Sequence, residues 1–201
     1  MEEKVVYDFD TVISRLGTQA EKYDARKQFY GKPDVEPFWV ADMDLPSPAF
    51  LSEALHDRVN HSLFGYTEQD PSLFEAIRWW MKDQHGVEVS PEMMSLSPSV
   101  VSTISMAIEA FTQPAEQVVI LSPVYGPFFS TVKLHERKVV DCPLVLDAGR
   151  YEINWEAVEI ALRDSETTLL LLCNPQNPSG RVWQADELKR LTILCKENGV
   201  V

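Results

Sequence analysis

The sequence predicts an α/β fold, a partial three-layer sandwich built on a mostly parallel sheet. Two short apolar runs without alternation, residues 118–121 and 168–173, are typical of strands buried on both faces. Segments in which apolar residues recur at helical spacing precede, separate and follow these runs, at 100–112, 154–161 and 185–197. The order of strand, loop and helix favours parallel strands joined by right-handed crossovers.

The composition is typical of a soluble globular protein, with 45% hydrophobic and 24% charged residues among 201. A net charge of −13 disfavours nucleic acids and anionic membranes as partners, because phosphate backbones need a basic surface. No apolar run reaches membrane-spanning length, and Met1–Lys4 lacks the basic and apolar regions of a signal peptide. We therefore expect no membrane partner and a cytoplasmic location.

The cysteines argue against a covalent or metal-based scaffold. Cys142, Cys173 and Cys195 are an odd and widely spaced set, which fits neither a disulfide framework nor a zinc site. We expect three reduced, mostly buried thiols and no bound metal.

The first part of the chain, up to Pro37, mixes charges with scattered aromatic residues and predicts an arm with short helical turns. An apolar run at 38–41 leads into Asp42 and Asp44. Two carboxylates at this spacing could suggest a metal site or an acid–base pair, but nothing nearby completes a ligand set. We interpret them as part of a solvated loop.

Helical spacing continues over residues 48–59 and again over 71–84, where Pro71 occupies the first helical position and Gly86 follows the last turn. The second helix is expected to bury one apolar face. The residues of that face are Leu73, Phe74, Ile77, Trp80 and Met81. Residues 94–96 are too short to be more than the end of a strand.

The predicted helix over residues 100–112 begins in small hydroxyl residues. Its uncoupled N–H groups and positive dipole end together predict an anion site. The alternative is that Ser97 or Ser99 only caps the helix.

The run at 118–121 ends at Ser122-Pro123 and leads to Tyr125. If the strands are parallel, Tyr125 reaches the same sheet edge as the loop after residue 173, where an aromatic ring could stack on a flat ligand. A further strand is expected over 139–145, interrupted by Pro143. Asn154 can cap the helix that follows.

The second apolar run ends in a loop that holds two side-chain amides, Asn174 and Asn177. Pro175 and Pro178 lack a backbone N–H, so neither the sheet ladder nor a helix can continue through them. Gly180 lets the chain turn away. Open α/β sheets bind ligands at the carboxyl ends of their parallel strands, so this loop is a candidate ligand site.

This loop carries a family resemblance. The string NPQNPSGR at 174–181 resembles the Asn-Pro-x-Asn-Pro-Thr-Gly signature of fold-type I pyridoxal phosphate enzymes, the class I/II aminotransferase family. With WVADMD at 39–44, FGYT at 64–67 and PVY at 123–125 in the same order, the chain is most similar to the cystathionine β-lyase branch, the carbon–sulfur β-lyases. The resemblance runs from about Tyr7 to the last residue.

The resemblance implies pyridoxal 5'-phosphate as cofactor and assigns residues to it. Ser99, Val100 and Val101 would hold the phosphate, largely through backbone N–H groups, Tyr125 would stack on the ring, and Asn177 would bind the phenolic oxygen. The family usually has glycine where Ser99 stands, and a positive φ there would strain a serine.

The resemblance also implies an assembly and a domain arrangement. In a homodimer, Tyr66 would reach the cofactor phosphate of the other subunit, while Trp39 and Ala41 would lie on the substrate side. Residues 1–47 would form the arm and part of a small domain, and 48–201 an incomplete, aminotransferase-like large domain.

The implied catalyst is not in this chain. The cofactor needs a lysine for its covalent attachment and an acidic group for its ring nitrogen, and the family places both beyond residue 201. None of the lysines present, such as Lys133, Lys138, Lys189 or Lys196, lies in the sequence context of the family's lysine. Because Val200 and Val201 begin a new apolar run, we expect this chain to be the amino-terminal half of a longer enzyme.

The implied activity is β-elimination from an S-substituted cysteine such as cystathionine, giving pyruvate, ammonia and a thiol. Two alternatives stay open. Transamination of another amino acid by a class I/II aminotransferase begins with the same proton abstraction. The chain could also be a non-catalytic, truncated product, and we expect residues 1–201 alone to be inactive.

Overall fold

The computed structural model describes residues 7–201, and the chain divides into two compact units, Met1–Asp70 and Pro71–Val201. The expectation about a signal peptide concerns Met1–Lys4 and lies outside the described residues. The domain boundary after residue 47 stays a prediction. Among residues 7–201, no helix is long and apolar enough to cross a membrane.

The first unit contains the short helices α1 (Glu21–Asp24) and α2 (Arg26–Tyr30) and the longer α3 (Ala49–Asn60). These confirm the predicted helical turns and the helix expected over 48–59. Trp39 packs between the rings of Phe29 and Tyr30, at centroid distances of 4.9 and 5.6 Å. Its indole nitrogen donates a hydrogen bond to the Lys22 carbonyl oxygen at 3.1 Å, which joins the segment around Trp39 to α1.

The second unit alternates helices and strands. Its elements are α4 (Pro71–His85), η1 (Pro91–Met93), α5 (Val100–Phe111), β1 (Gln117–Ile120), α6 (Pro127–Leu134), β2 (Lys138–Asp141), β3 (Val145–Asp147), β4 (Arg150–Glu152), α7 (Trp155–Arg163), β5 (Thr167–Leu171) and α8 (Ala185–Glu197). Side-chain caps set three of the helix starts: Ser99 for α5, Asn154 for α7, and a Gln184–Glu187 capping box for α8.

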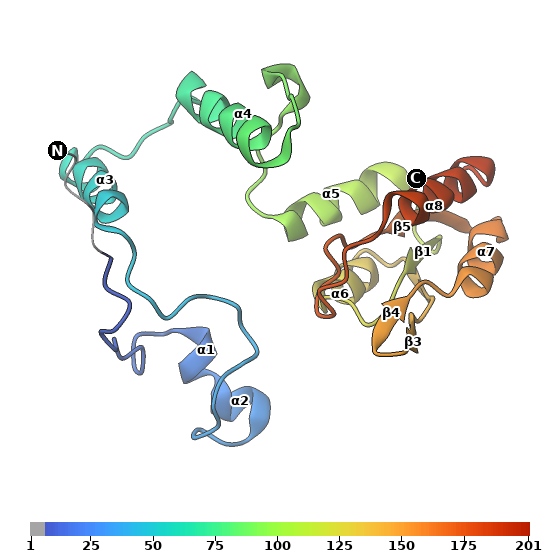
Figure 1. Cartoon of the computed structure of the whole chain (residues 1–201), viewed down its shortest axis with the longest axis horizontal. Helices are drawn as coiled ribbons and strands as arrows, with labels where there is room; N and C mark the ends of the chain where they lie inside the picture. Colours follow the sequence, from blue (N-terminus) through green and yellow to red (C-terminus); the bar gives the residue numbers. More distant parts are fainter. Residues whose placement is uncertain (1–6) are drawn as a thin grey trace. The chain divides into compact units, whose positions relative to one another are not determined.

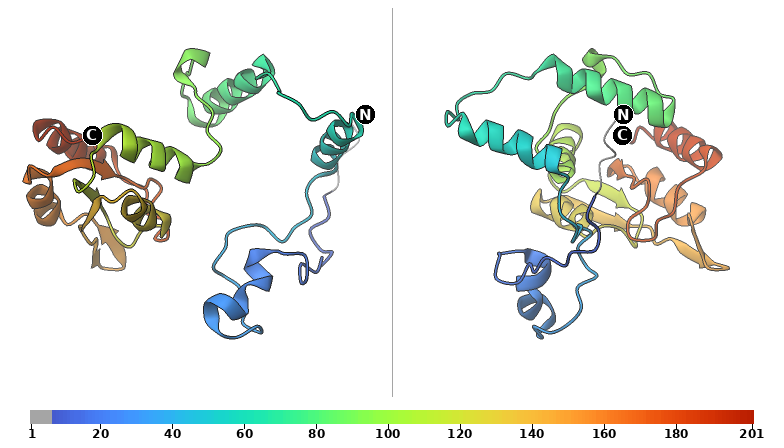
Figure 2. Two further views of the ribbon diagram at one scale, coloured as in Figure 1. Left: turned by 180° about the vertical axis from the view of Figure 1, so that it is seen from behind. Right: turned by 60° about the vertical axis from the view of Figure 1, so that its left-hand side comes forward.

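A three-stranded parallel sheet in the order β2-β1-β5 lies at the centre of the second unit. Val119 is the register partner of Val140 on one side, and Ile120 pairs with Leu171 on the other. Strands β3 and β4 form a separate antiparallel hairpin (Figure 2). The predicted α/β class with a parallel sheet is confirmed.

Helices cover both faces of this sheet, as Figure 1 shows for α5 and α6 on one face and α7 and α8 on the other. Successive side chains of a strand point to opposite faces, so β1 contributes to both cores. Val118 and Ile120 pack with α5 and α6, whereas Val119 and the following Leu121 pack with α7 and α8. Each of these four side chains is at most 2% exposed, which explains the continuous apolar run.

Three sequence predictions need correction. The strand expected over 139–145 is two strands in different sheets, because β2 ends at Asp141 and β3 begins at Val145, on either side of Pro143. Residues 94–96 form no strand. Helix α4 has the predicted bounds within one residue, but its predicted apolar face is not buried. Leu73 and Trp80 are 43% and 52% exposed, and among the described residues the cores on the two faces of the sheet include no residue of α4.

Candidate functional site

Two chain segments leave the carboxyl edge of the parallel sheet side by side, and the first turn of α5 is directed toward the same edge. The β1–β5 ladder ends at Ile120 and Leu171, so the segments that follow these two strands leave the sheet side by side. Helix α5 leads into the amino end of β1 and packs on it through Ile104 and Ile108, so it runs antiparallel to the strand. The N-terminus of α5 therefore lies toward the edge where β1 and β5 end (Figure 1).

The N-terminus of α5 combines a cap with free donors. Ser99 has φ −162°, which is extended backbone, so the strain expected for a serine at this position does not arise. Its Oγ accepts a hydrogen bond from the Ser102 N–H at 3.1 Å. The N–H groups of Val100 and Val101 donate to no group within residues 7–201. Ser99 thus caps the helix, and two donors of its first turn are left for an anion.

The two asparagines of the loop after β5 have different surroundings. Asn174 accepts a hydrogen bond from the Trp183 N–H at 3.3 Å through its Oδ1, so it closes the loop internally. Asn177 is exposed, and its side-chain amide has no hydrogen bond to any residue of the described chain. Tyr125, in the loop after β1, is 45% exposed. An amide and an aromatic ring are therefore both accessible beyond this edge.

Gln176 is a residue that the sequence analysis missed. It is 1% exposed, and its Nε2 donates to the carbonyl oxygens of Leu121 at 3.1 Å and Pro123 at 2.7 Å. It therefore ties the loop after β5 to the loop that carries Tyr125. In the sequence it fills the variable position between two Asn-Pro pairs, and no local pattern signals that its side chain points inward.

Arg181 anchors the other end of the same loop. Its guanidinium group binds Glu187 at 2.7 Å and Glu152 at 3.3 Å, and lies 4.9 Å from the ring centre of Trp183. Its Nε donates to the Tyr151 carbonyl oxygen at 3.0 Å. These partners come from β4, from α8 and from the segment before α8, and no local pattern around Arg181 indicates that it is buried.

In the first unit, ion pairs hold the segment that contains the predicted substrate-side residues. Asp44 accepts from Lys22 at 2.7 Å and from Arg15 at 2.8 Å, and Asp42 forms a short ion pair with Arg15. The hydrogen bonds from Lys22 and Arg15 lower the pKa of Asp44 to about 2, and the Arg15 guanidinium lowers the pKa of Asp42. The loop around Asp42 and Asp44, predicted to be solvated, is thus held by two cations that lie 20 or more positions away in the sequence.

Trp39 is half-buried beside α1 and α2, while Ala41 and Tyr66 are exposed. Tyr66 lies in the segment between α3 and α4. All three residues belong to the first unit. Their assignment to the substrate and to the other subunit stays a prediction, and so does the assignment of Ser99, Val100, Val101, Tyr125 and Asn177 to one cofactor.

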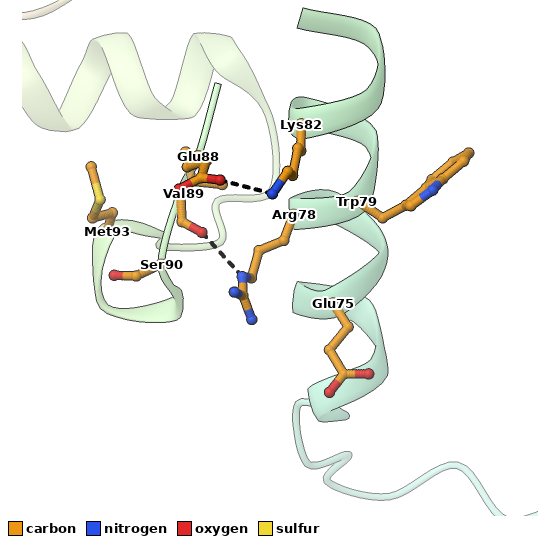
Figure 3. A pocket seen from close by; sticks show the side chains of 8 residues that line it. All are labelled: Glu75, Arg78, Trp79, Lys82, Glu88, Val89, Ser90 and Met93. Atoms are coloured by element: carbon orange, nitrogen blue, oxygen red, sulfur yellow. Dashed lines mark hydrogen bonds and ion pairs between the residues drawn. The ribbon is translucent and has the colours of Figure 1, made fainter. Parts of the chain in front are cut away.

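The second unit also contains a cavity of about 510 Å³ between α4 and the segment that precedes and includes η1 (Figure 3). Arg78 and Lys82 point across it from α4. Arg78 donates to the Val89 carbonyl oxygen at 3.1 Å, and Lys82 pairs with Glu88 at 2.8 Å. These contacts hold the segment after α4 against the helix, and the cavity includes none of the predicted site residues.

Comparison with known proteins gives a family match and close relatives. The family model described as aminotransferase class I and II matches residues 40–201. The chain is similar to the cystathionine beta-lyase PatB of Bacillus subtilis, with 45% identity over 96% of this chain and 50% of the relative. It is also similar to the protein MalY of Escherichia coli, with 32% identity over 97% of this chain and 50% of MalY.

Two solved structures resemble this chain over nearly its whole length. Cystalysin from Treponema denticola, described as containing a pyridoxal 5'-phosphate cofactor, has a TM-score of 0.89 and 33% identity, over 98% of this chain and 50% of the other. The C-S lyase of Staphylococcus hominis, described as bound to the same cofactor, has a TM-score of 0.87 and 31% identity over the same shares. The chain spans about half the length of the curated relatives it matches.

Proposed function

This chain belongs to the class I and II aminotransferase family, and on that premise we propose that it supplies a cofactor-holding part of a pyridoxal phosphate-dependent carbon–sulfur β-lyase. The observation that carries the proposal is that the loops after β1 and β5 leave the sheet side by side, with the free N–H groups of the first turn of α5 directed toward the same edge. The similarity to PatB and to the two structures described as cofactor-bound supports the same activity.

The side chains and donors at this edge fit a phosphorylated pyridine. The free N–H groups of Val100 and Val101, at the positive end of α5, suit the phosphate, and Ser99 keeps that helix end in place. The exposed ring of Tyr125 offers a stacking surface. The unpaired amide of Asn177 offers a donor to the phenolic oxygen of the pyridine ring.

Bound pyridoxal phosphate supplies an electron sink for the negative charge that develops at Cα of an amino acid substrate. The residues of this chain would bind and orient that group, while the lysine that moves the Cα proton is predicted to follow residue 201. The overall reaction takes an S-substituted cysteine such as cystathionine and water to pyruvate, ammonia and a thiol. In the proposed homodimer, Tyr66 reaches the phosphate of the other subunit, Trp39 and Ala41 face the substrate, and the enzyme is cytoplasmic.

Binding is tested with pyridoxamine 5'-phosphate, because this compound cannot react with surface lysines. We expect residues 1–201 to bind it, with weaker binding after Tyr125→Ala. The control is Tyr7→Ala, which removes a half-exposed tyrosine of the first unit. Binding that is absent, or equal in all three proteins, would contradict the proposed site.

Turnover separates the proposed lyase from its main competitor. With pyridoxal phosphate and cystathionine, residues 1–201 alone are expected to release no pyruvate and to form no borohydride-reducible link to a site lysine. Transamination is the second candidate, since the matching family model is that of the aminotransferases. The same assay is made on a protein that extends this chain to the full length of its relatives. Pyruvate formation without an added keto acid indicates the lyase, and a requirement for a keto acid indicates the aminotransferase.

A further inference from the structure

Gln176 connects the two loops that carry the proposed ring-binding groups. Its side-chain Nε2 donates to Leu121 and Pro123, while its backbone N–H donates to the Arg181 carbonyl oxygen at 2.7 Å and its carbonyl oxygen accepts from the Gly180 N–H at 2.6 Å. The backbone bonds close the loop after β5 on itself. The side-chain bonds fasten this closed loop to the neighbouring one.

Within residues 7–201, no other side chain makes a hydrogen bond between these two loops. Beyond the ladder that ends at Ile120 and Leu171, the hydrogen bonds between residues 121–126 and residues 172–183 of the described chain are the two from Gln176. Tyr125 lies two residues after one acceptor, and Asn177 is the next residue after Gln176 itself. The hydrogen-bonded link between the loop that carries the ring and the loop that carries the amide thus runs through one side chain.

The bonding of this side chain indicates a role beyond packing. Both of its contacts use the amide as a donor, whereas its Oε1 is buried and has no partner among the described residues. An unpartnered buried oxygen lowers stability, so a residue chosen only to fill this space would be apolar. A glutamine here is explained by the need for a donor that spans two carbonyl groups.

We propose that Gln176 is a positioning residue that holds Tyr125 and Asn177 at the separation needed to contact the same pyridine ring. This inference rests on the proposed function. Because Gln176 contacts neither the α5 N-terminus nor the free donors of Val100 and Val101, it sets the grip on the ring and leaves the grip on the phosphate unchanged.

The test compares residues 1–201 with two variants. Gln176→Met keeps the approximate volume and removes the donor, and Gln176→Glu keeps the shape but places a carboxylate against two carbonyl oxygens. Gln84→Met is the control, since this amide is exposed and bonds only to the neighbouring Asp83. Affinity for pyridoxamine 5'-phosphate and for inorganic phosphate is measured, together with amide hydrogen exchange in residues 121–126 and 174–180 without ligand.

We expect Gln176→Met to lose about tenfold in affinity for pyridoxamine 5'-phosphate while its affinity for inorganic phosphate stays that of the parent. At pH 8, Gln176→Glu should show the same loss of affinity for pyridoxamine 5'-phosphate. Toward pH 5.5 its affinity, compared with that of the parent at the same pH, should recover, because a protonated carboxyl group can donate a hydrogen bond to one of the two carbonyl oxygens. A purely structural role would weaken the binding of both ligands together.

Hydrogen exchange separates this inference from the function on which it rests. If the parent chain fails to bind pyridoxamine 5'-phosphate, the proposed function fails, but faster exchange in both loops of Gln176→Met still supports the connection. Unchanged exchange in both loops overturns the inference, whatever the ligand does. If Gln176→Met does not fold, Gln176→Glu takes its place. Its exchange in both loops, compared with the parent at the same pH, should be faster at pH 8 than at pH 5.5 if Gln176 connects the loops.

Discussion

Two asparagines three positions apart, Asn174 and Asn177, differ in what their amides can do. Asn174 accepts from the Trp183 N–H, while the Asn177 amide faces outward and has no partner in the described chain. A ligand can therefore use Asn177 without breaking a bond that keeps the loop closed.

We predict that Asn177→Ala lowers the affinity for pyridoxamine 5'-phosphate by about five- to tenfold, the equivalent of one hydrogen bond of about 1 kcal/mol. The unfolding temperature should not change, because the side chain makes no internal bond. Calorimetric titration and thermal unfolding measure the two effects. Asn60→Ala, at the end of α3, is the surface control, and an equal loss in both variants would contradict the role of Asn177.

The three cysteines differ in burial, and Cys142 is the buried one. All three cysteines are free, and Cys142 is 2% exposed, so that burial raises its pKa to about 11. Below pH 9 the thiol is neutral in both the folded and the unfolded chain. As the pH rises from 9 to 11, the unfolded chain loses its proton first, so stability falls.

Replacing Cys142 by alanine should therefore remove part of the stability loss between pH 9 and 11. Urea unfolding of the parent and Cys142→Ala at pH 8, 9.5 and 10.5 measures this. The difference in unfolding free energy between the two proteins should shrink as the pH rises. A difference that is constant over this range would show that the thiol does not titrate as described.

At the scale of elements, the ion pairs of Arg15 and Lys22 with Asp42 and Asp44 hold the segment after Trp39 to α1 and the chain before it. The folded pKa of Asp44, about 2, lies below its ordinary value of 3.8. The contribution of this carboxylate is thus complete above pH 4 and is lost as the pH falls through 2.

We predict a change in the surroundings of Trp39 between pH 4 and pH 2. The ¹⁹F NMR signal of fluorotryptophan, assigned with Trp39→Phe, reports it because the Trp39 indole is bonded to Lys22. In Asp44→Asn the signal should be altered already at neutral pH and change less on acidification. Identical titration curves for the two proteins would argue against these ion pairs.

Helices α5 and α6 are joined by a polar contact as well as by their apolar core. The imidazole of His135, which follows α6, bonds to the Ser105 hydroxyl at 2.5 Å and pairs with Glu109 at 3.2 Å, and both partners lie on α5. Because the imidazole is largely buried, its bonds are shielded from water.

We expect Ser105→Ala and His135→Gln each to lower the unfolding free energy by about 1 kcal/mol. The double variant should lose less than the sum, because both changes remove the same bond. Urea unfolding at pH 7 provides these values. Additive losses would mean that the two side chains do not interact.

The elements were predictable where the signals are local. Helix α8 has the predicted bounds, because the Gln184–Glu187 capping box and Asn198-Gly199 mark its ends within the sequence. The exposure of the apolar face of α4 was not predictable, since helical spacing identifies an apolar face but not what covers it. The same distinction applies to the site. Asn177 and Tyr125 stand in recognisable strings, whereas Gln176 bonds to residues 53 and 55 positions away and Arg181 bonds to Tyr151, 30 positions away.

At the scale of the whole molecule, many large apolar side chains are exposed in both units. In α3, Phe50 is 64% and Leu55 61% exposed, and in α4 Trp79 is 61% exposed. Apolar surface of this extent marks a site of association in soluble proteins. The predicted homodimer is one association that would cover it.

We predict that residues 1–201 associate in a concentration-dependent way. Leu55→Glu should shift the population toward smaller species, because it places a charge on the apolar face of α3. Sedimentation velocity between 1 and 100 µM, on the order of typical dimer affinities, measures the shift. Glu53→Gln serves as control, and unchanged sedimentation of Leu55→Glu would exclude α3 from the contact.

The loop after β5 separates its buried side chains from its exposed amide. Gln176, Arg181 and Trp183 face inward and are each at most 9% exposed, whereas Asn177 faces outward. Mutations that reach the outward position can alter ligand preference with little penalty in folding. Evolution could thus retune the chemistry of this rim while selection for a stable chain continued to act on its neighbours.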